Sequence, residues 1–219
     1  VFGPRHGVSM VLDLEYADGS RKQVVTDGSW KTMTGPWLSA DQLHGATYDS
    51  RREMPGWDTV AYAIATWKPA DVLNRPTARV TAFPGEPVRV MHTLPTRSVT
   101  EPLPGVRVVD FGQNLVGWVR FRVEGREGQK LVIRHGEMLN ADGTVYTENL
   151  RSARATDVFY LKGGVETLEP KFTFHGFRYA EITGLDGTPA PEDWSALVVY
   201  SDLRQTGEFS SSHELVNQI

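Results

Sequence analysis

The chain contains no cysteine in its 219 residues. A disulfide framework, a thiolate metal site and a cysteine nucleophile are therefore excluded. A sequence without cysteine is compatible with either redox compartment, so the localisation is left open between cytoplasmic and secreted. The sequence also lacks any apolar run of about 18 residues, the length that a membrane-spanning helix needs. We therefore expect a soluble protein without a membrane partner.

The sequence has no excess of positive charge. Lysine and arginine number 23 against 27 aspartate and glutamate residues, which gives a net charge of -4. Binding to a phosphate backbone needs a basic footprint, so we do not expect a nucleic-acid partner. The 40% hydrophobic and 23% charged residues are ordinary for a globular protein with one large or two modest domains.

Helical signals are scarce. Residues 39–43 are compatible with one helical turn, and Ser211 to Glu214 fit a capping box that opens a helix. Elsewhere the periodicity predicts strands. Asp18-Gly19 lies between two such runs, 10–16 and 21–25, and predicts a hairpin.

A second strand pair is predicted from residues 118–123 and 130–135, joined by a short polar loop. In the first run Val119, Phe121 and Val123 alternate with two arginines, which is typical of a strand with one buried face. Further strands are predicted at 158–161, 172–182 and 197–200. The predicted fold is all-β, an antiparallel β-sandwich or jelly roll in two β units with little helix.

Prolines mark the expected boundary between these two units. Pro69 and Pro76 interrupt the strand pattern near residues 68–77. The stretch 84–104 contains five more prolines, which remove ladder donors, and predicts an edge or crossover segment.

No pair of carboxylates has the arrangement of a glycosidase centre. Such a centre needs two carboxyl groups on either side of the scissile bond. The carboxylates within recognisable patterns are Asp110, Glu137, Glu148 and Asp157, and no strand presents two of them at i, i+2 or i+4. We therefore predict no catalytic residue within this chain.

Three other groupings favour structural roles. His135 and Glu137 lie two residues apart without a third ligand nearby, so we predict bonds to loop backbone and no metal site. For Asp157 we predict an ion pair with Arg151 or Arg154 that fixes the loop before it. Asp110-Phe111-Gly112 is predicted to end a strand before a turn, in which Gly112 and Asn114 suit the positions of positive φ.

Taken in order, the local patterns resemble one family. They are Asp110-Phe111-Gly112-Gln113-Asn114, Arg134-His135-Gly136-Glu137-Met138-Leu139, Ala153-Arg154-Ala155-Thr156-Asp157 and Phe174-His175-Gly176-Phe177-Arg178-Tyr179. This series resembles the accessory β-sandwich domain of bacterial α-L-rhamnosidases of glycoside hydrolase family 78. Upstream, Thr26-Asp27-Gly28-Ser29-Trp30 and Gly45-Ala46-Thr47-Tyr48-Asp49-Ser50-Arg51 resemble the end of the preceding rhamnose-binding-like domain.

The resemblance implies three segments. Residues 1–75 would be the C-terminal part of a rhamnose-binding-like jelly roll, 76–200 the accessory β-sandwich, and 201–219 the start of an (α/α)6 barrel. In that family the barrel carries the catalytic carboxylates. The chain is thus expected to be a non-catalytic accessory part of an inverting enzyme that releases terminal α-L-rhamnose from glycosides. Its expected partners are that barrel and rhamnose-containing glycosides, and apolar residues from Leu203 to Ile219 are expected to be exposed.

Four residues are candidates for sugar binding, because they combine aromatic faces with carboxylates in one loop-rich stretch. They are Trp37, Asp41, Tyr48 and Asp49. Relatives usually have a glutamate where this chain has Ala46, so binding is expected to be weak. No cofactor is expected here, although the complete sugar-binding domain implied by the resemblance could hold calcium. A stand-alone carbohydrate-binding module and a structural spacer without a ligand are the alternative functions.

Overall fold

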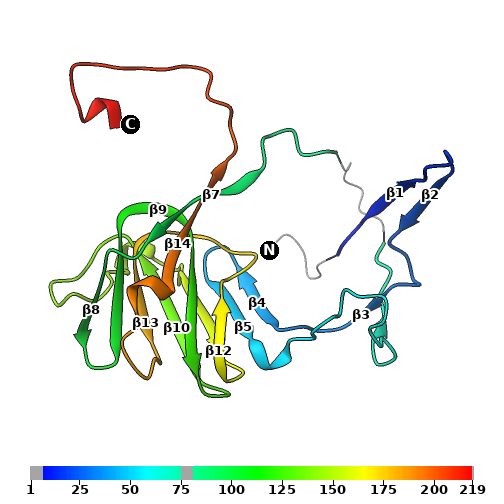
Figure 1. Ribbon diagram of the computed structural model, residues 1–219, viewed down its shortest axis with the longest axis horizontal. Coiled ribbons are helices and arrows are strands. Elements are labelled where there is room, and N and C mark those ends of the chain that lie inside the picture. Colours follow the sequence, from blue (N-terminus) through cyan, green and yellow to red (C-terminus); the bar gives the residue numbers. More distant parts are fainter. Residues whose placement is uncertain (1–6, 75–80, 219) are drawn as a thin grey trace. The chain divides into compact units, whose positions relative to one another are not determined.

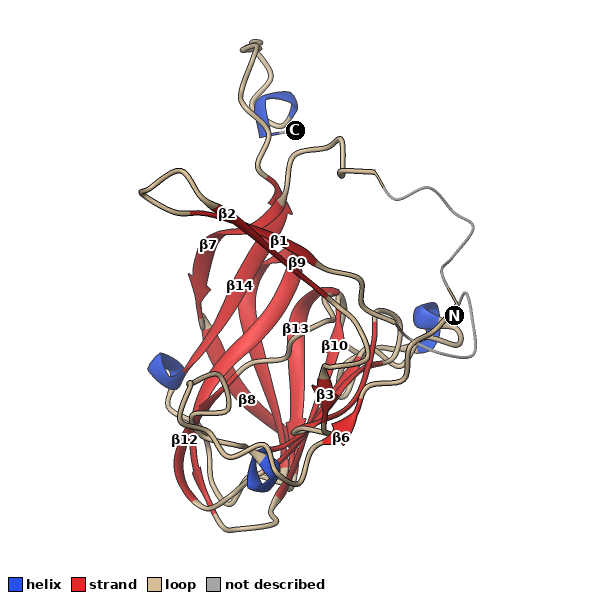
Figure 2. Cartoon of the chain, turned by 90° about the vertical axis from the view of Figure 1, so that its right-hand side faces the viewer, coloured by secondary structure: helices blue, strands red, loops and turns tan. Residues whose placement is uncertain are grey.

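The computed structural model describes residues 7–74 and 81–218. The chain divides into two compact units, the first comprising residues up to 35 together with 53–83, and the second comprising 36–52 together with the chain from 84 onward. The three segment boundaries expected from the sequence stay a prediction. Nearly all regular structure is strand, coloured red in Figure 2, and the described helices are short 3-10 turns. The all-β prediction is confirmed.

The first unit contains two small antiparallel sheets. Strand β1 (Val11–Glu15) pairs with β2 (Arg21–Val25), and β3 (Lys31–Thr32) pairs with β6 (Lys68–Pro69). Gly19 adopts a φ of 81° in the β1–β2 turn, as the predicted hairpin requires. Among the described residues, none of the fully buried hydrophobic side chains comes from this unit.

The second unit contains one ten-stranded sheet, ordered β4-β5-β11-β10-β13-β9-β14-β7, with β8 and β12 also paired to β9. The bounds are β4 (Trp37–Asp41), β5 (Gly45–Asp49), β7 (Val88–Pro95), β8 (Ser98–Leu103), β9 (Val106–Gly125), β10 (Lys130–Gly136), β11 (Thr156–Tyr160), β12 (Gly164–Leu168), β13 (His175–Thr183) and β14 (Trp194–Ser201). The 3-10 turns are η1 (Ser50–Arg52), η2 (Glu148–Leu150), η3 (Pro191–Asp193) and η4 (Val216–Gln218). No helix in the described ranges has the length and hydropathy needed to span a bilayer.

Strand β9 organises this sheet. Its first half pairs with β8 and β13, and its second half pairs with β14 and β12, so one strand of 20 residues serves four neighbours. In Figure 1 the green β9 ribbon bends over at its middle. The inward faces of these strands enclose a core that includes Phe121, Phe159, Phe177 and Trp194. The stacked Phe121 and Trp194 rings, 4.7 Å apart, lie within it.

Two strand predictions need correction. Residues 118–123 and 130–135 form strands, but they do not pair with each other, because 118–123 pairs with β14 and β12 whereas β10 pairs with β11 and β13. Residues 39–43 form the end of β4 and a tight turn, not a helical turn. The proline-rich stretch forms β7 and β8, and β7 is an edge strand, as predicted.

The strand that contains Asp110-Phe111-Gly112 does not end there. Phe177 pairs with Leu115 and Tyr179 with Asp110, so residues 111–114 bulge out opposite a single residue, Arg178. Gly112 has the predicted positive φ, at 85°, but Asn114 does not have a positive φ, so that part of the prediction is wrong. The Arg178 guanidinium donates two bonds of 2.9 Å to the Asp110 carboxylate and holds the base of this bulge.

The C-terminal residues behave as expected. Leu203, Phe209, Leu215 and Val216 are exposed, by 41% to 74%. The fifth residue of that prediction, Ile219, lies outside the described residues.

Candidate functional site

The antiparallel pair of β4 and β5 positions all four candidate sugar-binding residues. Trp37 pairs with Tyr48 at one end of the ladder, whereas Asp41 pairs with Gly45 beside the turn. Trp37 and Asp41 are four residue steps apart along β4, a distance of about 13 Å. Asp49 closes β5.

Two of the candidates form a ring pair. The Trp37 and Tyr48 centroids are 4.5 Å apart with a tilt of 52°, and the Tyr48 ring continues towards the buried Phe159 at 6.3 Å. Tyr48 therefore connects a half-buried tryptophan to the core of the sandwich. This geometry supports the aromatic half of the sugar-binding hypothesis.

The two carboxylates have local partners. Asp49, 6% exposed, accepts two bonds of 2.8 Å from the Arg51 guanidinium, which lowers the pKa of its carboxyl group despite burial. Asp41 is exposed and accepts the backbone N–H groups of His44 and Leu43 through Oδ1, each at 2.8 Å. These two bonds lower the pKa of Asp41.

An aromatic residue outside the four candidates belongs to this site. Phe172 lies 6.1 Å from Trp37 between ring centroids, at an interplanar angle of 83°, and is 75% exposed. The sequence places Phe172 in a run predicted to be a core strand, whereas β13 begins only at His175. Phe172 has a positive φ of 65°. The sequence gives no indication of this backbone conformation.

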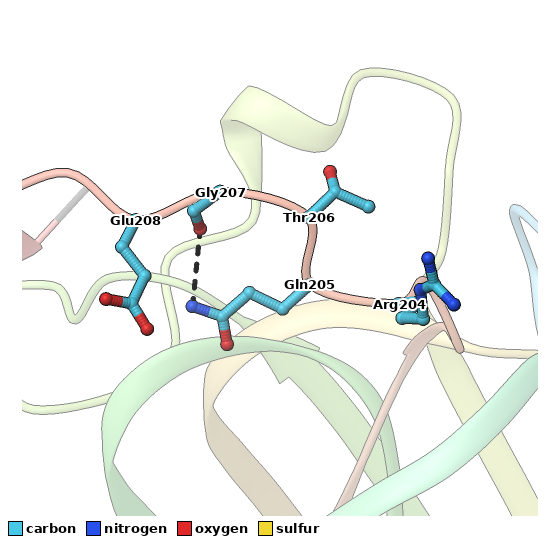
Figure 3. Close-up of a pocket in the computed structure, with 5 residues that line it drawn as sticks. All are labelled: Arg204, Gln205, Thr206, Gly207 and Glu208. Carbon is cyan, nitrogen blue, oxygen red and sulfur yellow. Dashed lines mark hydrogen bonds between the residues drawn. The ribbon is translucent and has the colours of Figure 1, made fainter.

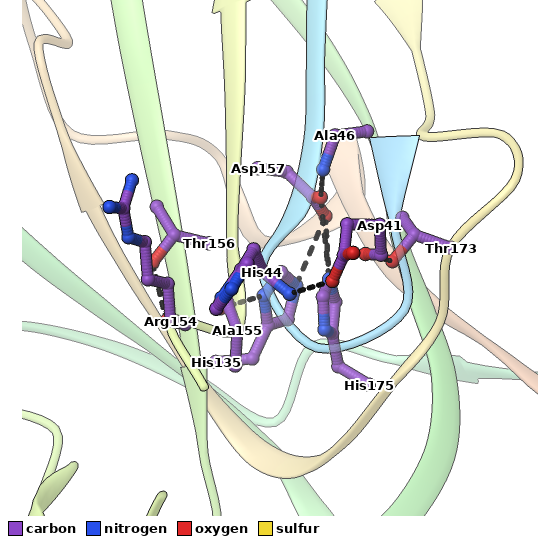
Figure 4. Close-up of polar contacts among 10 residues, drawn as sticks. All are labelled: Asp41, His44, Ala46, His135, Arg154, Ala155, Thr156, Asp157, Thr173 and His175. Carbon is purple, nitrogen blue, oxygen red and sulfur yellow. Dashed lines mark hydrogen bonds and ion pairs between the residues drawn. The ribbon is translucent and has the colours of Figure 1, made fainter. Parts of the chain in front are cut away.

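A second group of functional side chains is buried within the sandwich (Figure 4). His135 on β10, Asp157 on β11 and His175 on β13 are 0%, 1% and 4% exposed. The His175 Nε2–H donates to the Asp157 carboxylate at 3.2 Å, and Asp157 also accepts the Ala46 backbone N–H at 2.8 Å. The Asp157 side chain thus connects its own strand β11 to β5 and β13, and the predicted ion pair with Arg151 or Arg154 is wrong.

His135 is held by loop backbone, as predicted. Its Nδ1–H donates to the Ala155 carbonyl at 3.0 Å, while its Nε2 atom has no hydrogen-bond partner within the described part of the chain. Burial lowers the pKa of His135 from 6.5 to about 4, with a further contribution from the nearby His175. Burial opposes ionisation of Asp157, but the His175 bond and the two imidazoles still lower the pKa of its carboxyl group.

The cluster does not have the geometry of a metal site. The potential ligand atoms of His135, Asp157 and His175 lie within 4.8 Å of one another. The two imidazole rings, however, are stacked, with centroids 4.2 Å apart and planes only 25° apart. Nitrogen lone pairs lie in the ring plane, so two stacked rings cannot both direct them at one ion. Calcium in particular prefers oxygen ligands, which two imidazoles do not supply.

Two of the remaining motif carboxylates have hydrogen-bond partners of their own. Asp110 is bound by Arg178, and the exposed Glu137 accepts a bond of 2.9 Å from the Asn114 amide. His135 is buried in the core while Glu137 is exposed beyond the end of β10, so the two side chains do not share chemistry.

The hollows of the second unit include two candidate binding sites. One of about 340 Å³ is lined by Arg134, Asn140, Asp142 and Glu181, among others, but their polar groups mostly bond to one another or to the 140–145 turn. The other is lined only by the consecutive residues 204–208 (Figure 3). A single extended segment does not build a binding site.

Comparison with known proteins gives two family matches. Residues 1–92 match the α-L-rhamnosidase N-terminal domain, and residues 100–200 match the bacterial α-L-rhamnosidase concanavalin-like domain. An α-L-rhamnosidase of Streptomyces avermitilis is 44% identical over 222 residues, covering 100% of this chain and 21% of that protein. One from Formosa agariphila is 37% identical, covering 95% of this chain and 23% of the relative.

Solved structures agree. The crystal structure of the Streptomyces avermitilis α-L-rhamnosidase complexed with L-rhamnose has a TM-score of 0.89 and 45% identity, covering 95% of this chain and 20% of that one. The α-L-rhamnosidase from Dictyoglumus thermophilum has a TM-score of 0.90 and 40% identity, covering 94% and 24%. The chain therefore spans between a fifth and a quarter of the length of these relatives.

Proposed function

This chain belongs to the bacterial α-L-rhamnosidase family, and from that premise we propose that it is a non-catalytic accessory part of such an enzyme. The whole enzyme would hydrolyse terminal α-L-rhamnose from glycosides, with inversion. Its catalytic barrel would lie in the part of the relatives that this chain does not match. The accessory sandwich would pack against that barrel.

The observation that carries this proposal is the state of the motif carboxylates. Hydrolysis with inversion needs two carboxyl groups about 6.5 to 9.5 Å apart with space for substrate and water. Asp157 is 1% exposed, and Asp110 is held in a bidentate pair with Arg178. Neither is available to a glycosidic oxygen, and the family match covers only the N-terminal and concanavalin-like domains.

The test is turnover of an aryl α-L-rhamnoside by the purified chain. We expect no release of the aryl group above background. Release that disappears in Glu137→Gln or Asp110→Asn would contradict the proposal, because it would place a catalytic carboxylate on the sandwich. An Asp18→Asn variant, changed in an exposed hairpin turn, is the matched control.

A second candidate function is carbohydrate binding, and the Trp37–Tyr48 ring pair favours it. Rhamnose-containing glycosides would then be ligands of the chain itself, with Trp37, Asp41, Tyr48 and Asp49 as the proposed contacts. We propose calcium binding only for the complete sugar-binding domain. A spacer without a ligand is the remaining alternative, and it predicts no sugar binding at all.

A further inference from the structure

Residues 36–52 belong to the second unit, although the chain on both sides of them belongs to the first unit. We call this segment the strap, and it contains β4, β5 and η1. Within the described residues, one ladder joins the strap to the rest of the sheet, the parallel pairing of residues 47–49 with residues 158–160 of β11. The strap is therefore attached to the sandwich by few strand pairs.

Backbone hydrogen bonds also attach the turn of the strap. The N–H groups of Ala155 and Thr156 donate to the carbonyls of Leu43 and His44, at 3.0 and 3.1 Å. Ala155 has a φ of 44°, in the left-handed region that residues other than glycine rarely adopt. Such a conformation costs free energy and persists only while the surrounding structure holds it. Release of the strap breaks the two bonds but allows Ala155 to relax.

The strap lies directly against a buried carboxylate (Figure 4). The Ala46 N–H donates to the Asp157 Oδ1 atom at 2.8 Å. Gly45 comes so close that a Cβ at its position would overlap the Thr156 carbonyl and would lie 2.9 Å from Asp157 Oδ1. Ala46 is itself 3% exposed. The strap therefore excludes water from this side of the buried histidine and aspartate cluster.

The closed strap disfavours a proton on His135. This ring faces two ionisable groups, Asp157 of β11 and His175 of β13, and the strap turn adds Asp41 and His44, of which Asp41 is bound by its own turn. Full burial and the His175 ring, stacked at 4.2 Å, oppose protonation of His135 more than the Asp157 carboxylate favours it. Contact with water removes this disadvantage.

We propose that the strap is released by acid, because His135 binds a proton poorly while the strap excludes water and readily once the strap opens. The strap then opens locally at mildly acidic pH, before the core strands of the sandwich unfold. Its opening frees the chain that continues into the first unit on both sides of the strap.

The pKa of His135 sets the pH range of this release. Burial lowers that pKa from 6.5 to about 4 in the closed form. The closed form is therefore fully favoured above pH 6.5 and loses this preference as the pH falls towards 4, because only the open form binds the proton in this range. The ratio of open to closed strap should rise about tenfold for each pH unit below 6.5, or about 30-fold by about pH 5.

Hydrogen exchange of the whole chain, followed by NMR and corrected for intrinsic rates, tests the proposal at about pH 7.5 and about pH 5. The informative amides are those of Ala46, Ala155 and Thr156, whose hydrogen bonds join the strap to the sandwich. Their protection should fall about 30-fold at the lower pH and should be weaker than that of Phe121 in β9 at both. Protection that does not change with pH would overturn the proposal, as would protection equal to that of Phe121.

Gly45→Ala opens the strap without acid, because its φ of 97° and the overlap with Thr156 exclude a side chain. The His135 ring should then titrate near pH 6.5 instead of near 4 in NMR spectra. Gly105→Ala is the matched control, since this glycine also has a positive φ, 78°, but no neighbour within 4 Å of an added Cβ. A His135 ring that still titrates near pH 4 beside an unprotected strap would contradict the proposal.

His135→Gln provides a second variant in case Gly45→Ala does not fold. It should remove the pH dependence of the Ala46 amide, whereas His44→Gln, on the strap turn itself, should retain it. A pH dependence that persists in His135→Gln would assign the release to another group and overturn the proposal. None of these results bears on the accessory role, which is judged by turnover of the aryl rhamnoside.

Discussion

The two ring nitrogens of His135 have unlike surroundings. Nδ1 donates its proton to a backbone carbonyl, so in the neutral ring Nε2 carries the lone pair. Nε2 lies 3.8 Å from the Asp157 Oδ2, which is too long for a hydrogen bond. Full burial without a partner at Nε2 explains why the neutral form is preferred.

This preference makes the stability depend on pH. The pKa of His135 is depressed to about 4 in the folded protein from 6.5 when unfolded. The contribution of neutral His135 to the free energy of unfolding is therefore complete above pH 6.5. It is lost as the pH falls towards 4, since the unfolded chain then binds a proton that the folded chain does not. We expect the free energy of unfolding to decrease by up to about 3 kcal/mol over this window.

Urea unfolding followed by tryptophan fluorescence at several pH values measures this decrease. His135→Gln should be less stable at neutral pH but should lose most of the slope between pH 6.5 and 4. The exposed His44 provides the comparison, because His44→Gln should retain the slope. A slope that is unchanged in His135→Gln would assign the pH dependence to other groups.

At the scale of single residues, the sequence predicted contacts with chain neighbours better than contacts with residues distant in sequence. The Gly112 conformation and the backbone bond of His135 follow from neighbours within the chain. The partners of Asp157 could not be predicted, because His175 and Ala46 reach it only when three strands assemble. Proximity in sequence grouped Trp37 with Tyr48, whose rings lie 4.5 Å apart, but could not group them with Phe172, whose ring lies 6.1 Å from Trp37. Sugar binding by these residues stays a prediction.

At the scale of elements, the bulge in β9 is the least expected feature. Residues 111–114 face a single residue of β13, yet Phe111 still packs into the core against Phe177 at 5.7 Å. The Asp110 carboxylate accepts from Arg178 and also from the Gly112 N–H at 2.7 Å. One carboxylate thus fixes both the start of the bulge and its attachment to the neighbouring strand.

Gly112→Ala tests how strongly this bulge depends on its conformation. A φ of 85° is unfavourable for alanine, and the added Cβ would lie 3.2 Å from the Arg97 side chain. We expect a loss of about 1 to 2 kcal/mol in the free energy of unfolding. Gly207→Ala, at a glycine with open space around it and no positive φ, should change nothing. Equal effects in the two variants would mean that the bulge is not strained by a side chain.

The strand runs themselves were predictable and their pairing was not. Alternation of buried Val119, Phe121 and Val123 with exposed arginines appears in β9 as the pattern predicts. The short polar loop after this strand then led to the prediction that it pairs with the next strand in sequence as a hairpin. In the structure this part of β9 pairs with β14 and β12, which lie farther along the chain, since pairing in a sandwich is decided by long-range packing of the core.

On the scale of the whole molecule, the two units differ in what they bury. The second unit contains all members of the main buried hydrophobic cluster. The first unit has two-stranded pairings and exposes many large apolar side chains, among them Val11, Trp57 and Val60. Two-stranded pairs without a buried face are marginal in water. The sequence suggested the C-terminal part of a jelly-roll domain here, and that expectation stays a prediction.

Hydrogen exchange measures this difference directly. Amides of β9, β10 and β13 are central in the ten-stranded sheet and should exchange only through global opening, whereas amides of β1 and β2 should exchange through local fraying. We expect opening free energies at least about 3 kcal/mol lower in β1 and β2 than in β9. The edge strand β7 is the internal comparison, because it lies in the large sheet but has only one neighbour on the sheet path, and its protection should be intermediate. If β1 and β2 were protected as strongly as β9, the first unit would have to bury apolar area comparable to that of the sandwich. The exposed side chains of β1 argue against this.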